Sequence, residues 1–373
     1  MTTVSIVVPT IGRPSLTDLL RALGPLPDGM ELIIVDDRPD VRTPLEVGES
    51  ARIVAGRRAG PAAARNAGWS AARHEWVAFL DDDVRPEPGW FWRLLGDLRE
   101  AGPEVGGVQG RITVPLPAGR RATDWERVTA GLADGEWITA DMAYRRAALA
   151  ATGGFDERLP RAFREDAELA HRVRRAGWQL RHGQRTTTHP VRPEAPWVSL
   201  RLQRGNADDA LLRRLYGPHW RTTLGIPPGR RHRHTMITTG LAAATLCTAA
   251  RLVTGRPRWT VAAAVATAAW AAGTAEFAAA RIRPGPRDRR EVTTMLLTSI
   301  AIPPVAVTHW LRGWFRWRGA QPLPPPASDR SERFGGGRPC GRVSGGAPDP
   351  GESFGDGEPR GWVSGGDRAG VER

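Results

Sequence analysis

Lysine is absent from this chain of 373 residues, so all 53 of its basic side chains are arginine. Against 40 acidic side chains they leave a formal net charge of +13. Such a surplus suits phosphate-bearing ligands and anionic lipid surfaces. Nucleic acid is not an expected partner, because the arginines are scattered and no recognition module is visible.

Cysteine is also scarce. Cys247 and Cys340 form neither a zinc cluster nor a disulfide framework, which favours a reducing compartment. The first apolar run begins at Val4, which leaves no room for a signal peptide before it. We therefore expect the N-terminal domain to lie in the cytoplasm.

Short β-rich runs and amphipathic helical segments alternate over the first 80 residues. The expected strands cover residues 4–8, 31–35, 52–54 and 75–80, and the expected helices cover residues 15–23 and 60–68. This alternation predicts an α/β fold, with a mostly parallel sheet and helices on both of its faces.

Polar residues follow three of these strands directly. Pro9 and Thr10 end the first strand, Asp36 and Asp37 follow the second, and the carboxylates of residues 81–83 follow the fourth. Open α/β sheets bind ligands at this edge. Three adjacent carboxylates repel one another unless solvent or a cation intervenes. A hard divalent cation, Mn²⁺ or Mg²⁺, that also takes diphosphate oxygens would relieve the repulsion, although a solvated acidic turn is the alternative interpretation.

Six motifs, in this order and spacing, make residues 1–220 resemble the family 2 inverting glycosyltransferases of the GT-A fold. They lie at residues 4–10, 34–37, 64–68, 79–83, 144–157 and 164–169. The resemblance implies a Rossmann-like GT-A domain that moves a sugar from a nucleotide-diphosphate donor to a hydroxyl acceptor. It also implies a divalent metal that neutralises the leaving diphosphate.

The resemblance assigns a metal-binding role to Asp83 as first ligand. Asp81 and Asp82 would hold metal-bound water or ribose hydroxyls, and Asp81 is also a candidate ligand. His189 would reach back to the metal or the diphosphate, because neutral imidazole also ligates Mn²⁺. For Asp82 a solvated neighbour, and for His189 an ordinary loop histidine, are the alternatives.

Nucleotide contacts are expected from residues of the strand ends and of the second helix. The candidates are Pro9, Thr10, Asp36, Asp37, Arg65 and Asn66. Asp37 would accept from a base N–H, whereas Asp36 could equally satisfy nearby backbone N–H groups. Arg65 and Asn66 could face the diphosphate or simply lie at the surface.

Asp166 occupies the position of the family's catalytic base, in the first turn of a helix that begins at Glu165. The helix dipole favours the ionised carboxylate there by ~0.3–1 kcal/mol, although a helix cap is the alternative role. Glu165 is expected near the donor and acceptor. Gly153 and Gly154 are expected to let the backbone approach the donor sugar closely.

The chain changes character after residue 225. Residues 236–250, 259–275 and 292–311 are free of charged side chains, and arginines flank each segment. A membrane span needs about 20 apolar residues, a length that the third segment alone reaches cleanly. The first two could form a hairpin, and an Ala-rich soluble bundle is the alternative.

We therefore predict a GT-A domain at residues 1–225, a membrane-associated helical region at 226–318 and a disordered Pro/Gly-rich tail with a 20-residue repeat at 319–373. The predicted function is metal-dependent transfer of a sugar to a lipid-linked or cell-envelope glycan at the cell membrane. A non-catalytic nucleotide-sugar-binding scaffold is the alternative. Processive synthesis is disfavoured, because residues 203–206 depart from the Gln-x-x-Arg-Trp motif of processive relatives.

Overall fold

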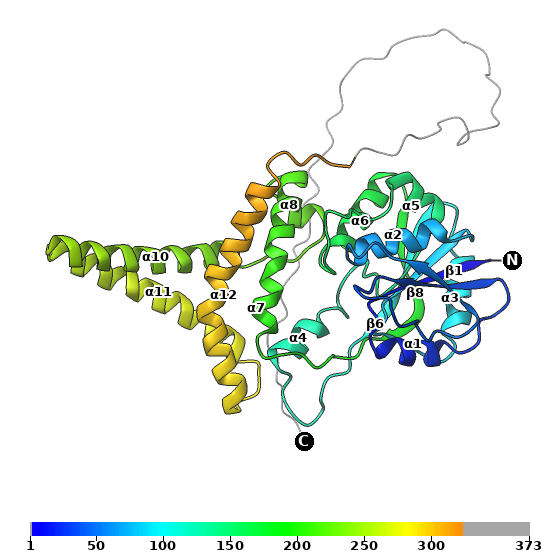
Figure 1. Ribbon diagram of the computed structural model, residues 1–373, viewed down its shortest axis with the longest axis horizontal. Coiled ribbons are helices and arrows are strands. Elements are labelled where there is room, and N and C mark those ends of the chain that lie inside the picture. The colour runs from blue at the N-terminus through cyan, green and yellow to red at the C-terminus, as the bar shows by residue number, and fades with distance from the viewer. Residues whose placement is uncertain (1, 324–373) are drawn as a thin grey trace, which may run out of the picture. The chain divides into compact units, whose positions relative to one another are not determined.

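One mixed sheet organises the N-terminal part of the protein in the computed structural model, which describes residues 2–323 (Figure 1). The strand order among these residues is β3-β2-β1-β4-β7-β6-β8-β5. The strands are β1 (Val4–Thr10), β2 (Met30–Asp36), β3 (Ala51–Ala55), β4 (Trp76–Leu80), β5 (Arg85–Pro86), β6 (Val105–Thr113), β7 (Asp141–Arg145) and β8 (Gln179–Thr188).

Strands β1 to β4 run parallel to one another, as the alternation predicted, and β6 runs parallel to β8. β7 lies between β4 and β6 and is antiparallel to both, and β5 is antiparallel to β8. The predicted α/β class is confirmed, and the sheet is mixed because of β7 and β5. The register of β1 and β2 places Thr10 opposite Asp36, so the polar strand ends lie at one edge.

Helices cover both faces of the sheet, as expected. The helices of this region are α1 (Ser15–Leu23), α2 (Pro61–Ala71), α3 (Trp90–Arg99), α4 (Asp124–Ala130), α5 (Arg146–Thr152) and α6 (Glu165–Arg175). α1 and α3 pack in one apolar cluster, whereas α2, α5 and α6 pack in a second one on the other face.

Alternate residues along each strand belong to these two clusters. Ile6 and Ala78 belong to the first, whereas Val7 and Phe79 belong to the second, and all four are fully buried. Two-sided burial explains why the strands read as continuous apolar runs rather than as alternating polar and apolar residues. It also fixes the register, since a slip by one residue would exchange the two faces.

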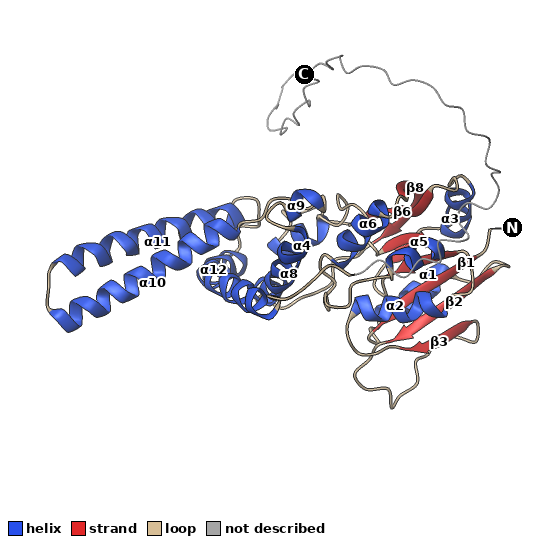
Figure 2. Ribbon diagram, turned by 90° about the horizontal axis from the view of Figure 1, so that it is seen from above, coloured by secondary structure: helices blue, strands red, loops and turns tan. Residues whose placement is uncertain are grey.

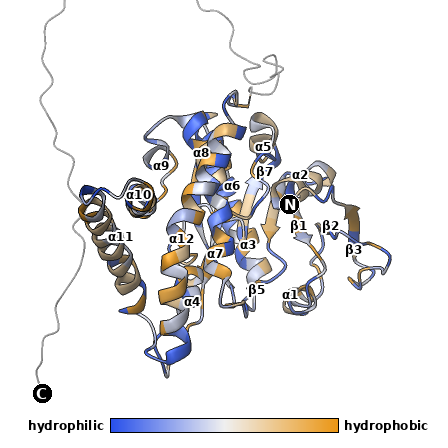
Figure 3. Ribbon diagram, turned by 60° about the vertical axis from the view of Figure 1, so that its left-hand side comes forward, coloured by the Kyte–Doolittle hydropathy of each residue, from blue (hydrophilic) through white to orange (hydrophobic). Residues whose placement is uncertain are grey.

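Helices make up the rest of the described chain. They are α7 (Val198–Leu202), the 3₁₀ turn η1 (Gln203–Gly205), α8 (Asn206–Tyr216), α9 (Trp220–Thr223), α10 (Arg231–Thr254), α11 (Arg258–Ile282) and α12 (Arg289–Arg316). α10, α11 and α12 are each long and apolar enough to cross a membrane. Figure 3 shows apolar stretches along α12. The predicted tail lies outside the described residues except for residues 319–323.

Candidate active site

The three carboxylates after β4 have different surroundings. Asp82 is buried and accepts hydrogen bonds from the Thr10 hydroxyl at 2.7 Å and from Arg13 Nη1 at 2.7 Å. It therefore ties the acidic loop to the end of β1. Thr10 also accepts a hydrogen bond from the backbone N–H of Gly12, so its hydroxyl is engaged on both sides.

Asp81, Asp83 and His189 face one another. One ligand atom from each lies within 4.8 Å of the others. The short strand β5 pairs with the end of β8 and so brings the acidic loop beside His189. His189 Nε2 lies 3.6 Å from Asp83 Oδ1. Two carboxylates and one imidazole are a donor set that divalent Mn²⁺ accepts.

The charges in this cluster are only partly compensated. Burial raises the pKa of Asp83, and the negative charge of Asp81 raises it further, against the opposing effects of His189 and Arg192. Burial also acts to raise the pKa of Asp81, but the Arg65 guanidinium outweighs it and lowers that pKa. A bound cation would favour both ionised carboxylates. The residues thus fit a divalent metal.

Arg65 links the acidic loop to the start of α6. Its side chain is 2% exposed and donates to Asp81 at 2.7 Å and to Glu165 at 2.8 Å. The two carboxylates raise the pKa of Arg65 despite its burial, so the guanidinium is charged. Of the alternatives weighed for Arg65, a surface position is therefore wrong, because α2 directs this arginine inward.

Asp166 and Glu165 open α6, where Arg164 has a left-handed backbone with φ of 75°. Asp166 is half-buried and accepts the backbone N–H of Ala167 at 2.8 Å. Burial raises the pKa of Asp166, which strengthens it as a base relative to a free aspartate. Glu165 is buried and accepts the backbone N–H of Phe163. Burial raises the pKa of Glu165 to about 8, with a further contribution from Asp166.

The acidic pair after β2 is bound within the protein. Asp37 is buried and accepts the backbone N–H groups of Arg58 at 2.6 Å and Gly60 at 3.3 Å. Asp36 accepts hydrogen bonds from Nε and Nη2 of Arg38, and these hydrogen bonds lower the pKa of Asp36. Both residues lie where the resemblance placed the nucleotide, and both also shape the loop that precedes α2.

Asn66 and Gly154 hold the glycine-rich turn after α5. The Asn66 amide donates to the Phe155 carbonyl and to Glu157, and its oxygen accepts from Phe155 N–H and from the Trp69 indole. A Cβ on Gly154 would lie 2.4 Å from Asn66 Oδ1. A close approach to α2 therefore requires glycine at this position, and the expected approach to the donor sugar stays a prediction.

Gly153 ends α5 in a left-handed backbone conformation with φ of 75°, and a Cβ at this position would meet no heavy atom within 4 Å. Glycine is favoured here because it adopts this conformation without strain. The half-buried Pro9 lies in β1 opposite Val35.

Two functional candidates escaped the sequence analysis. Arg13 binds Asp82, and Arg192 Nε lies 3.0 Å from Asp83 Oδ2. Each lies in a loop beside the acidic residues, and in an arginine-rich chain neither stood out. The position of Arg192 three residues after His189 was the one available signal.

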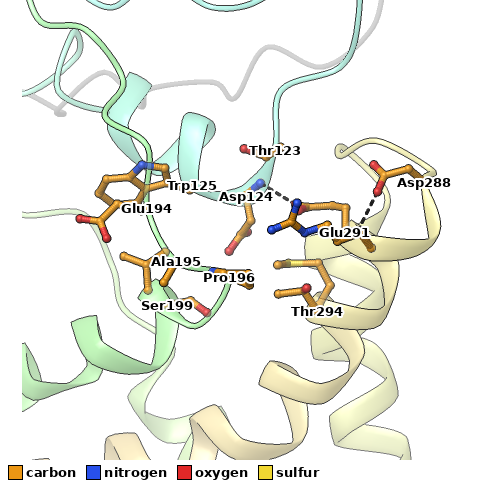
Figure 4. Close-up of a pocket in the computed structure, with 13 residues that line it drawn as sticks. Thr123, Asp124, Trp125, Glu194, Ala195, Pro196, Ser199, Asp288, Glu291 and Thr294 are labelled. Carbon is orange, nitrogen blue, oxygen red and sulfur yellow. Dashed lines mark hydrogen bonds between the residues drawn. The ribbon is translucent and has the colours of Figure 1, made fainter.

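A cavity of about 300 Å³ lies between α4, residues 194–199 and the start of α12 (Figure 4), and its lining includes no residue of the acidic cluster. Its lining includes carboxylates, an indole and a hydroxyl, from Asp124, Trp125, Glu194, Ser199, Asp288 and Glu291. The Trp125 indole donates to the Arg192 carbonyl at 2.8 Å, while the Arg192 side chain reaches Asp83. Arg192 thus contacts both the cavity wall and Asp83.

The mixed α/β sheet and the carboxylates clustered at its edge agree with the GT-A fold that the motifs predicted. Residues 5–139 match the model of the family described as Glycosyl transferase family 2. The match covers about a third of the chain and agrees with the motifs found in the sequence.

Among curated proteins, the chain is similar to the pre-mycofactocin glycosyltransferase of two Mycobacterium tuberculosis strains, CDC 1551 / Oshkosh and ATCC 25618 / H37Rv. Each is 34% identical over 136 residues, which cover 33% of this chain and 28% of the relative. The match thus spans little more than a quarter of each relative's length.

Two solved structures show more distant likenesses. Glucosyl-3-phosphoglycerate synthase from M. tuberculosis, in complex with Mn²⁺, UDP-glucose and phosphoglyceric acid, has a TM-score of 0.39 and 19% identity, over 61% of this chain and 81% of that one. GalNAc-T7 with UDP, GalNAc and Mn²⁺ has a TM-score of 0.42 and 17% identity, over 52% and 45%. Both likenesses are too distant to bear on substrate or mechanism.

Proposed function

We propose that this chain is a metal-dependent inverting glycosyltransferase that moves a sugar from a nucleotide-diphosphate donor to a hydroxyl acceptor. The observation that carries the proposal is the convergence of Asp81, Asp83 and His189 near Asp166, within a family 2 domain. Arg65 connects the two groups through its ion pairs with Asp81 and Glu165.

The donor nucleotide would lie along the ends of β1 and β2, beside Pro9, Thr10, Asp36 and Asp37. In this arrangement its diphosphate would extend toward the acidic loop. Mn²⁺ or Mg²⁺ held by Asp83, Asp81 and His189 would neutralise the negative charge that develops on the leaving diphosphate. The partly exposed Arg192 guanidinium is placed to contact the same phosphates.

Asp166 would act as the general base. The acceptor oxygen attacks the anomeric carbon from the side opposite the diphosphate, the bond between carbon and phosphate oxygen breaks, and the acceptor proton passes to Asp166. Configuration inverts because a single displacement occurs. An elevated pKa suits this role, since a stronger base accepts the proton more readily. Asp166 is half-buried at the start of α6, which supports approach of an acceptor to this residue.

The acceptor would approach from the side of the cavity in Figure 4. Trp125 in the wall of this cavity donates a hydrogen bond to the Arg192 carbonyl, and the wall also includes the first turns of α12. A lipid-linked or cell-envelope glycan would suit an enzyme that carries apolar helices, and transfer would end after one or a few sugars. The acceptor named by the curated relatives does not carry over, because the match covers 28% of their length.

We place the enzyme at the cell membrane, with its catalytic domain in the cytoplasm, and the apolar helices support the membrane placement. The division into residues 1–225, 226–318 and 319–373 remains a prediction. All residues assigned to catalysis or donor binding fall within the first of these segments.

Titration of the purified chain with UDP, GDP and dTDP sugars, with and without Mn²⁺, tests the proposal. We expect one donor to bind in a metal-dependent manner and to be turned over. Asp83→Ala should abolish metal-dependent binding, because the diphosphate would then face the remaining carboxylates with a weakened metal site. Asp18→Ala, at an exposed ion pair, is the matched control.

Unchanged Mn²⁺-dependent affinity in Asp83→Ala contradicts the metal assignment. Metal-dependent binding without turnover in the wild type, across a panel of membrane-extract acceptors, favours the non-catalytic scaffold instead. A ligand at 100 times its Kd stabilises by ~2.7 kcal/mol, which a thermal shift detects readily.

A further inference from the structure

The three apolar helices are not arranged side by side. α10 and α11 form an antiparallel hairpin, and α12 lies across the base of that hairpin (Figures 1 and 2). Ile237, Phe277 and Ile302 form the contact between the three helices. Ile237 is near the start of α10 and Phe277 near the end of α11, whereas Ile302 is at the middle of α12.

This contact has a geometric consequence. Membrane-spanning helices are tilted by about 0–40° from the bilayer normal, so helices that lie across one another do not both span. If the hairpin crosses the bilayer, its base lies at the surface, and the middle of α12 lies there too. If α12 crosses instead, the hairpin lies along the bilayer plane. The structure therefore requires a choice between the two.

The packing of α12 decides this choice. One stripe of the helix is buried, and it includes Met295, Ile302, Ala306 and Gly313. A Cβ on Gly313 would lie 2.5 Å from the carbonyl oxygen of Ala207 in α8, so the two helix backbones are in close contact. α8 is a charged helix of the catalytic region, and it could not accompany α12 into hydrocarbon.

Arg281 makes a second connection between α12 and the catalytic region, this time through α4. This buried arginine, in the last turn of α11, donates to Thr298 and Ser299 of α12 and pairs with Asp124 of α4 at 2.7 Å. The Arg127 side chain donates to the Arg281 carbonyl. The end of α11 and the middle of α12 are thus held against the soluble domain.

The hairpin, in contrast, exposes its apolar side chains. Leu252 is 80% exposed, Val253 86%, Leu246 69% and Val261 67%. Thr245 and Thr248 of α10 each donate their hydroxyl to the backbone carbonyl four residues earlier. Because these hydroxyls are satisfied within the helix, they add little cost to burying α10 in lipid. These helices have outer surfaces that suit lipid.

We propose that the α10–α11 hairpin inserts across the lipid bilayer, while α12 lies in the bilayer surface at the base of the hairpin, between lipid and the catalytic domain. The segment that looked best as a span by sequence alone is then the one that does not cross.

Helix lengths fit this arrangement. Beyond the base, α10 runs from Ile237 to Thr254 and α11 from Arg258 to Phe277, which at ~1.5 Å per residue is roughly 26–29 Å, close to the ~30 Å of hydrocarbon. Glu276 lies near the base, where it pairs with Arg230 and Arg233, so this charge stays at the surface.

Arginine distribution gives the orientation. Eight arginines flank the base of the hairpin, at positions 230, 231, 233, 281, 283, 287, 289 and 290, whereas three lie at its tip, at positions 251, 256 and 258. The excess of positive charge stays on the cytoplasmic side. The base, and with it the catalytic domain, is therefore cytoplasmic, and the tip reaches the opposite surface.

The outer face of α12 suits the bilayer surface. Leu297, Ile300, Leu311 and Phe315 are between 43% and 56% exposed and lie on one side of the helix. Trp314 is stacked on Trp310 near its end. Apolar residues on one face with tryptophans beside arginines are typical of helices that lie in the interface.

Cysteine labelling with a membrane-impermeant maleimide tests this topology. Both native cysteines are replaced by alanine, and single cysteines are introduced at exposed positions as Arg256→Cys at the tip, Arg287→Cys between α11 and α12, and Gly319→Cys after α12. In sealed inverted vesicles we expect positions 287 and 319 to react at once. Position 256 should react only after detergent is added.

Each other pattern overturns the proposal. Labelling of 287 and 319 on opposite sides means that α12 crosses the bilayer. Immediate labelling of 256 together with the other two means that the hairpin does not cross, and release of the chain by alkaline carbonate means that nothing is inserted. Reaction of all three positions in detergent is the control for cysteine reactivity. No donor or acceptor is needed, so the result is independent of the proposed activity.

Discussion

Two parts of the same sheet edge carry acidic and amide side chains, and they differ in how those groups are satisfied. Beside β1 and β2, Asp37 accepts two backbone N–H groups, and Asn66 uses both its amide nitrogen and its oxygen within the protein. Beside β4 and α6, Asp83 and Asp166 lie among like charges, and burial raises their pKa values.

This difference separates polar groups that stabilise the fold from carboxylates that are available to bind a metal or accept a proton. A polar group with all of its hydrogen bonds made inside the protein stabilises the fold, and its removal leaves buried partners unsatisfied. A buried or half-buried carboxylate with a raised pKa is poorly stabilised as the anion by the protein alone, and it gains from a cation or a proton. Mutations in the two parts should therefore fail in different ways.

The largest effect is expected at Asp166. Asp166→Asn should lower turnover by ~10²–10⁴-fold, the usual contribution of a positioned general base. Donor affinity and melting temperature should stay close to those of the wild type, because asparagine keeps the shape and can still accept the Ala167 N–H. Single-turnover kinetics with saturating donor, together with Mn²⁺-dependent nucleotide titration, measures both.

Normal donor binding with turnover within about threefold of wild type would show that Asp166 is a helix cap, since that margin is well below the general-base range. Glu165, the neighbouring residue, is then the next candidate for the general base. Its burial and the hydrogen bond that it accepts from Arg65 make it a poor alternative, and Glu165→Gln in the same assay checks this.

Asn66 should show the opposite behaviour. Asn66→Ala leaves the Phe155 backbone groups and the Trp69 indole without their partner, and each unsatisfied buried group costs about 1–3 kcal/mol. We expect a loss of unfolding free energy of roughly 2–4 kcal/mol on this basis. Mn²⁺ affinity should change by less than about threefold, or ~0.7 kcal/mol. Chemical denaturation and metal titration check the two expectations.

Asn206→Ala is the matched control, because that amide donates only to Gln203 within the same helical turn. Its loss of stability should be clearly smaller. If Asn66→Ala instead retained stability and lost nucleotide affinity, Asn66 would be a nucleotide-binding residue, as the sequence analysis expected.

The sequence predicted where the polar strand ends meet because parallel strands place their carboxyl ends at one edge. Thr10, Asp36 and the 81–83 triplet lie at that edge in the structure. It also distinguished the buried strands from the helices, since continuous apolar runs and helical spacing are local properties. These parts of the fold and site follow from short stretches of chain.

Side-chain pairings over long sequence separations could not be predicted in this way. Arg65 meets Glu165, 100 residues away, and the fully buried Arg185 of β8 meets Asp141 of β7, although β6 lies between these two strands. In a chain with 53 arginines, composition gives no sign of which of them turn inward. The same limit applies to α12, whose length and hydropathy predict a span although it also packs closely against α8.

The smallest predicted effect concerns the pH dependence of stability and tests whether Glu165 belongs with the poorly satisfied groups. Burial raises the pKa of Glu165 to about 8 from an ordinary value of 4.5. Between these values the folded protein holds a proton that the unfolded chain has released. Stability from this group is therefore present below the lower value and is lost as the pH rises toward 8.

Melting temperature in metal-free buffer should therefore fall as the pH rises from 5 to 8, and Glu165→Gln should reduce that fall, because glutamine does not titrate. Glu104→Gln, at an exposed carboxylate, should leave the slope unchanged. Asp83 and Asp166 contribute in the same direction, so part of the slope should persist in Glu165→Gln. Equal slopes in the wild type and Glu165→Gln would mean that the Arg65 ion pair keeps Glu165 ionised throughout. Glu165 would then join Asp37 and Asn66 among the groups that the protein itself satisfies.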